Sequence, residues 1–148
     1  MADGLSVMRG LHQWFGIAGH NTLIQVLGVG LLCLPLLNRT AYDQWAFRIG
    51  LLSAVLMWVV LFNHRAETAT LVIAVCGCAL GYATSRRTAL DTGLLVAVVL
   101  VTCLAPTDLW PLWLRQGVFK PYALAVVPVI GMWLKRTADL LGRAGTTA

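Results

Sequence analysis

Long apolar runs separated by short polar segments make up most of this chain. Five of these runs contain 16 or 17 residues each and cover positions 21–37, 46–62, 67–83, 90–105 and 119–134. They are apolar all round instead of along one stripe, a pattern that a helix facing water does not tolerate. Because such helices approach the length needed to cross a hydrocarbon core of about 30 Å, we expect an all-α integral membrane bundle of about five transmembrane helices over residues 21–134.

Residues 1–20 follow a different pattern, in which apolar side chains recur at three- and four-residue spacing. These side chains are Leu5, Met8, Leu11, Trp14 and Phe15. The spacing predicts an amphipathic helix that lies in the membrane interface. A cleaved signal peptide is the alternative interpretation, but its apolar region would follow the basic residues directly, whereas the first long apolar run begins only at position 21.

Composition and charge narrow the class of protein further. Hydrophobic residues make up 59% of the chain and charged residues only 11%, against about 25% charged residues in ordinary globular domains. The formal net charge is +5, but the basic residues stand singly or in pairs between apolar runs instead of gathering on one stretch. We therefore expect no nucleic-acid partner and no separate soluble catalytic domain.

The basic residues also indicate an orientation. With five spans, one side of the membrane collects seven Lys and Arg residues and the other side collects four. The larger set consists of Arg39, Arg48, Arg86, Arg87, Lys135, Arg136 and Arg143. By the positive-inside rule this set, with a basic tail over residues 135–148, faces the cytoplasm across the plasma membrane. The turn from Asn63 to Glu67 then faces outward.

The tight turn between the second and third apolar runs is the first candidate site. From position 62 it reads FNHRAETAT, in which Asn63, His64, Arg65 and Glu67 are polar or ionisable. Held at a membrane surface, these side chains can contact an anionic headgroup, and the imidazole can donate to a phosphate oxygen or exchange a proton. The alternative is structural: Arg65 and Glu67 pair at the surface and cap a helix hairpin, while His64 fills polar space beside a helix end. The residues alone leave both interpretations open.

The segment over 105–117 is the second candidate, because it combines Asp108 and Arg115 with two tryptophans that suit a membrane interface. Ligand binding and simple anchoring are both compatible with it. No nucleotide-binding loop, nucleophile elbow or metal-binding pair occurs in the sequence.

Small residues inside the apolar runs favour packing over chemistry. The four cysteines all lie within these runs, at Cys33, Cys76, Cys78 and Cys103. Free thiols in such positions behave as small hydrophobic residues, so we expect no metal site. Gly77 and Gly81 stand four residues apart, a small-xxx-small pattern that lets a neighbouring helix approach closely.

The two candidate segments resemble the C-terminal part of the family 87 glycosyltransferases, integral-membrane enzymes with a GT-C fold. The family motif reads approximately FNHKAESPT and stands here as FNHRAETAT. A second family block is similar to APTD from position 105 and KPYAL from position 120, with Pro128 and Trp133 in step. The chain departs from the family at Thr68-Ala69, where the family has Ser-Pro, and it matches only the C-terminal portion of a family member.

The resemblance implies transfer of a hexose, usually mannose, from a polyprenyl-phosphate sugar to an acceptor at the outer membrane face, with no cofactor. It implies that His64 and Arg65 contact the donor phosphate or sugar and that Asn63 and Glu67 orient them. Residues implied to line the outer cavity are Asp108, Arg115 and Lys120.

The resemblance does not supply a catalytic residue. The catalytic Asp of the family belongs to an N-terminal part that has no counterpart here, so an N-terminal half of a split enzyme would have to provide it. The alternative function is a small non-enzymatic membrane protein that acts as an interaction or lipid-binding module.

Overall fold

The computed structural model describes residues 7–16, 21–63, 68–85, 87–104, 107, 110–114, 116–117 and 123–142. Within these ranges the regular secondary structure is entirely helical, so the fold is all-α. The α-helices are α1 (Val7–Phe15), α2 (Asn21–Cys33), α3 (Trp45–Leu61), α4 (Leu71–Thr84), α5 (Ala89–Ala97), α6 (Leu112–Leu114) and α7 (Val127–Gly142). A π-helix over Val98–Cys103 continues α5, and 3₁₀ turns lie at Leu34–Leu37, Arg39–Ala41, Thr68–Thr70 and Leu124–Val126.

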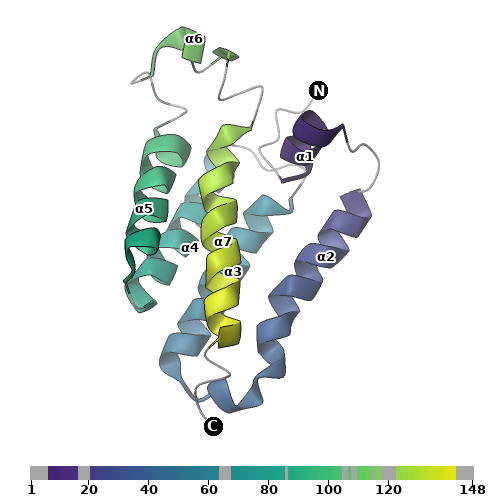
Figure 1. The fold of residues 1–148 in the computed structure, drawn as a ribbon, viewed down its shortest axis with the longest axis vertical. Coiled ribbons are helices and arrows are strands. Elements are labelled where there is room, and N and C mark those ends of the chain that lie inside the picture. Colours follow the sequence, from purple (N-terminus) through teal and green to yellow (C-terminus); the bar gives the residue numbers. More distant parts are fainter. Residues whose placement is uncertain are drawn as a thin grey trace.

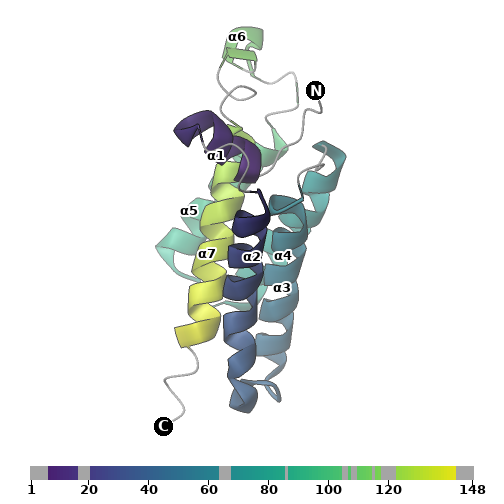
Figure 2. The same cartoon turned by 90° about the vertical axis from the view of Figure 1, so that its right-hand side faces the viewer.

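The long helices run up and down beside one another (Figure 1). α1 and α6 lie at one end of the bundle, which we call the upper end, where α3 ends and where α4 and α7 begin (Figures 1 and 2). The lower end carries the 3₁₀ turns between α2 and α3 and the end of α7. Because short connections make consecutive helices antiparallel neighbours, segments distant in sequence meet at each end.

α3 contributes most to the hydrophobic core and packs against both α4 and α7. Its side chains Phe47, Met57 and Leu61 are fully buried, together with Val98 of the π-helix and Leu140 of α7. Helices α3 and α4 are apolar on every side, so their burial follows from position in the bundle and not from an amphipathic stripe.

Small residues let α3 and α4 approach closely. The Ser53 hydroxyl of α3 donates a hydrogen bond of 2.7 Å to the carbonyl oxygen of Gly77. A Cβ atom on Gly77 would lie 3.0 Å from the Ser53 carbonyl oxygen, and one on Gly81 would lie 2.7 Å from the Ser53 hydroxyl. The predicted packing role of Gly77 and Gly81 is therefore confirmed.

The expectation of an integral membrane bundle of five transmembrane helices is wrong. Across the described ranges, no helix combines the length and the apolar character that crossing a bilayer requires. Even α3, with 17 residues, rises only about 25 Å, which is less than a hydrocarbon core of about 30 Å. Four expectations that depended on it are wrong for the same reason: the plasma-membrane location, the GT-C membrane fold, the cytoplasmic C-terminus and the outward-facing Asn63–Glu67 turn.

α2, α4 and α5 are shorter than the corresponding apolar runs, and α7 is displaced from its run, because other backbone structure interrupts these runs. α2 ends at Cys33, where a 3₁₀ turn with Pro35 at its second position begins, and α5 changes into the π-helix at Val98. The last apolar run contains Ala123 in the left-handed region (φ 49°), so α7 begins only at Val127. α7 then continues through residues 135–142, which the sequence predicted to be a tail.

Gly28 of α2 provides a test of this packing, because a Cβ atom there would lie 2.4 Å from a ring carbon of Phe62. The ring stacks on Trp58 and makes an edge contact with Trp133, so it has little room to move. We expect Gly28→Ala to lower the free energy of unfolding by about 1–3 kcal/mol through overpacking. Gly30→Ala, with open space on the same helix, should raise it by about 0.5–1 kcal/mol. Denaturant unfolding of the purified variants measures both, and equal effects would contradict the packing.

Candidate functional site

Most of the residues predicted to form the donor site lie outside the described residues. These are His64, Arg65 and Glu67 in the turn, and Asp108, Arg115 and Lys120 in the later segment. Asn63 is described: it is exposed, lies two residues beyond the last residue of α3, and its backbone N–H donates to the Val60 carbonyl oxygen at 3.4 Å. The structure therefore places Asn63 at the upper end of the bundle.

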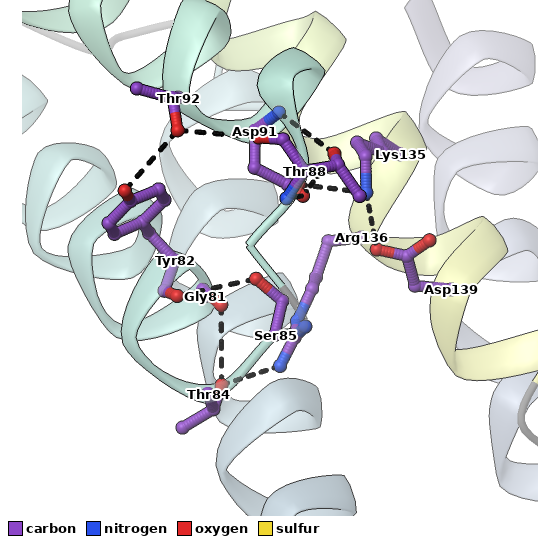
Figure 3. A network of polar contacts seen from close by, with 10 residues as sticks. All are labelled: Gly81, Tyr82, Thr84, Ser85, Thr88, Asp91, Thr92, Lys135, Arg136 and Asp139. Carbon is purple, nitrogen blue, oxygen red and sulfur yellow. Dashed lines mark hydrogen bonds and ion pairs between the residues drawn. The ribbon is translucent and has the colours of Figure 1, made fainter.

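A cluster of polar side chains that the sequence did not single out joins α4, α5 and α7 (Figure 3). We call it the polar cluster and define it by Thr84, Thr88, Asp91, Lys135, Arg136 and Asp139. Asp91 and Arg136 are buried, with 2% and 3% of their surface exposed. Charged residues are almost never buried to this extent unless they are paired, so the contacts of each determine its role.

Asp91 is held by the start of its own helix. Thr88 is the N-cap of α5, and its backbone N–H and its hydroxyl donate to the Asp91 carboxylate at 2.9 and 2.5 Å. The Asp91 backbone N–H donates in return to the Thr88 hydroxyl at 3.2 Å. This reciprocal capping box satisfies the first free N–H groups of the helix and places the carboxylate at its positive end.

Lys135 of α7 completes the cluster by bridging two carboxylates. Its ammonium nitrogen lies 2.8 Å from an oxygen of Asp91 and 2.8 Å from an oxygen of Asp139, four residues further along the same helix. Burial alone would raise the pKa of the Asp91 carboxyl, but the hydrogen bonds from Lys135 and Thr88 and the ammonium charge outweigh it, so this pKa is lowered. Burial opposes the charge on Lys135 in the same way, and the two carboxylates nevertheless raise its pKa.

Arg136 enters the interior beside this pair. Its guanidinium donates to the Thr84 hydroxyl of α4 at 2.6 Å. Glycine makes room for it, because a Cβ atom on Gly50 would lie 2.6 Å from a guanidinium nitrogen. A small cavity of about 10 Å³ lies next to it, lined by Met57, Gly81, Ser85, Asp91, Met132, Arg136 and Asp139. This volume holds about one water molecule.

The chemistry of the polar cluster is structural. Asp91 is ionised and Lys135 is protonated at neutral pH, so neither is poised to exchange a proton there. Each is paired across two helices, and the pairing ties α5 to α7. The sequence did carry a signal, because Thr88-x-x-Asp91 precedes an apolar run, as a helix N-terminus does, and Asp139 follows Lys135 by four residues.

An open apolar groove of about 340 Å³ lies between α4 and the π-helix. We call it the α4 groove and define it by Ala69, Leu71, Val72, Val75, Cys76, Thr102 and Cys103. Thr102 uses its hydroxyl internally, donating to the Ala125 carbonyl oxygen at 2.6 Å. Burial raises the pKa of the Cys103 thiol, which keeps it uncharged. The groove therefore offers hydrocarbon and neutral sulfur to a ligand.

The cysteines contribute thiols and no disulfide within the described part of the chain. Burial raises the pKa of the Cys78 thiol to about 12, and that thiol contacts the Met57 sulfur at 3.5 Å. In the same ranges, His, Cys, Asp and Glu side chains form no group of three or more that could hold a metal ion.

Comparison with known proteins assigns the chain to no group. No protein-family model matches it, and neither a curated protein nor a solved structure matches it. What the fold defines is the class, an all-α helical bundle with an internal polar cluster and an apolar groove. The similarity to family 87 glycosyltransferases stays a resemblance of short motifs.

We expect Asp91→Asn to lower the free energy of unfolding by about 2 kcal/mol at neutral pH, because it removes the charge from a buried, hydrogen-bonded pair. A carboxyl whose pKa is lowered by folding contributes stability above its unfolded pKa of about 3.9, and that stability is lost as pH falls through the folded value. The difference from the unmodified chain should therefore be constant between about pH 5 and 9 and shrink below about pH 4.

Thermal unfolding as a function of pH measures this difference. Asp43→Asn is the matched control, because Asp43 is fully exposed at 3.9 Å from Arg48, and such a pair contributes little. A difference for Asp91→Asn that persists unchanged at pH 3 would contradict the assignment of its stability to the carboxylate charge.

Proposed function

We propose that this chain is a lipid-binding module, whose outward apolar side chains are covered by the hydrocarbon of lipids. The observation that carries the proposal is the exposure of large apolar residues on every long helix. Leu27 of α2, Trp45 of α3 and Leu90 of α5 are 67%, 72% and 60% exposed. Extended apolar surfaces of this kind mark contacts with lipid or with other proteins.

The distribution of these side chains favours lipid over a protein partner. α2 and α5 lie on opposite sides of the bundle (Figure 1), and exposed apolar residues occur on both. One protein interface covers one face of a module, whereas separate lipid molecules can bind at several faces. Covering a large apolar side chain contributes about 1.5–3 kcal/mol, so a few such residues suffice for stable binding.

Flotation with phosphatidylcholine vesicles tests this function. We expect the purified chain to float with the vesicles and Leu90→Asp to bind about tenfold more weakly, because a loss near 1.4 kcal/mol gives that factor. Ala89→Asp is the control, since Ala89 is exposed in the same first turn of α5 and presents little apolar surface. A chain that stays with the lipid-free fraction and instead forms oligomers sensitive to Leu90→Asp would contradict lipid binding.

A second candidate function is the donor-holding part of a polyprenyl-phosphate-sugar transferase, with the base supplied by a separate N-terminal half. One contact supports it. The rings of Phe62 and Trp133, which belong to the two separate blocks of the family resemblance, lie 5.4 Å apart in an edge arrangement. One residue of each block therefore meets the other in the fold, as a shared binding site requires.

Donor binding tests the second candidate. We expect saturable binding of polyprenyl-phosphate mannose that His64→Ala and Arg65→Ala each weaken about tenfold, because a charged hydrogen bond to phosphate contributes about 1.5–3 kcal/mol. Arg48→Ala is the control, since Arg48 lies in the first turn of α3, at the lower end of the bundle. If polyprenyl-phosphate mannose binds the unmodified chain no more tightly than it binds a chain carrying both His64→Ala and Arg65→Ala, the transferase candidate is removed and the lipid-binding function stays in place.

A further inference from the structure

We infer that the α4 groove is a specific site for one hydrocarbon chain of a lipid, with the headgroup outside the groove. The inference rests on the proposed lipid-binding function and deepens it. It assigns one hydrocarbon chain to a defined groove, in addition to the lipid that contacts the rest of the apolar surface. Three properties of the groove carry it: its lining, its backbone and its size.

The lining excludes a polar ligand. Its one hydroxyl, on Thr102, is committed to the carbonyl oxygen of Ala125 at 2.6 Å, and the other side chains around it are aliphatic or thiol. A ligand with hydrogen-bonding groups would lose its contacts with water and find no replacement here. Water gains few hydrogen bonds from such a lining, and covering its apolar side chains with hydrocarbon is favourable.

The wall opposite α4 is the π-helix, a rare backbone form that recurs at functional sites. Its wide turns end with the backbone N–H of Leu104 donating to the carbonyl oxygen of Val99 at 3.2 Å, five residues back. Thr102 and Cys103 of this segment line the groove, while Val98 of the same segment is fully buried in the core. The π-helix therefore holds one wall rigidly against the core and presents the other side to a ligand.

The size and opening of the groove suit a single chain. Its volume of about 340 Å³ falls in the range of small-molecule sites, roughly 300–1,000 Å³. Val72 and Cys76 line the groove and are exposed, so the groove opens to the surface along α4.

Two native thiols report on occupancy, and a third serves as control. Cys76 and Cys103 line the groove, whereas Cys33 is exposed on α2. The probe is 1-undecanol, an uncharged eleven-carbon chain, and the rate of alkylation by N-ethylmaleimide is followed at each cysteine by peptide mass spectrometry. At about ten times its Kd, the probe should slow alkylation of Cys76 and Cys103 about tenfold and leave Cys33 unchanged.

A matched pair of variants locates the site. Val72→Trp fills the groove and should abolish the effect of 1-undecanol on Cys103. Ile73→Trp adds the same ring at an exposed position of α4 outside the groove and should retain the effect. Absence of protection, equal protection of all three thiols, or full protection in Val72→Trp would each overturn the inference.

Vesicle flotation of the same variants separates this inference from the proposed function. Flotation without thiol protection would leave the lipid-binding function standing and remove the groove as its site. Thiol protection without flotation would keep the groove as a site for a single chain and remove the broader function.

Discussion

Gly77 and Gly81 have no side chain to hold α4 away from α3. The two helices therefore lie close enough for the Ser53 hydroxyl to donate a hydrogen bond of 2.7 Å to the carbonyl oxygen of Gly77. Neither helix has an amphipathic stripe to direct its packing, so the contact is set by shape and by this hydrogen bond. Once α3 and α4 are joined, α7 packs against the pair, and the π-helix and α5 close the other side. The packing of the other helices depends on this close contact between α3 and α4.

Another glycine explains how a charged side chain enters an apolar bundle. Arg136 lies in space that Gly50 provides, and it reaches Thr84 at the end of α4. Its neighbour Lys135 meets the capping carboxylate of Asp91. Removing one partner of such a pair leaves a charge buried without compensation, so the polar cluster ties α5 to α7.

The apolar exterior and the α4 groove are two consequences of one composition. A chain with 59% hydrophobic residues cannot bury all of them in a bundle of this size, and the helices carry the excess on their outer faces. The α4 groove lies between α4 and the π-helix that follows α5, and both elements line it with apolar side chains. Hydrocarbon fits both surfaces, because neither offers hydrogen bonds that a polar ligand requires.

Local sequence determined that the apolar runs are helical and that Gly77 and Gly81 lie at a close contact, since both follow from spacing along the chain. The polar cluster was beyond such reasoning, because Asp91 and Lys135 are 44 positions apart in the sequence and meet only when α5 packs on α7. The apolar runs failed to predict the helix bounds for a related reason. Ala123 and the π-helix interrupt the apolar runs, and an apolar run records hydrophobicity but not where its backbone changes form. Only the tertiary structure decided which side chains face inward, because helices that are apolar all round give no stripe from which to read it.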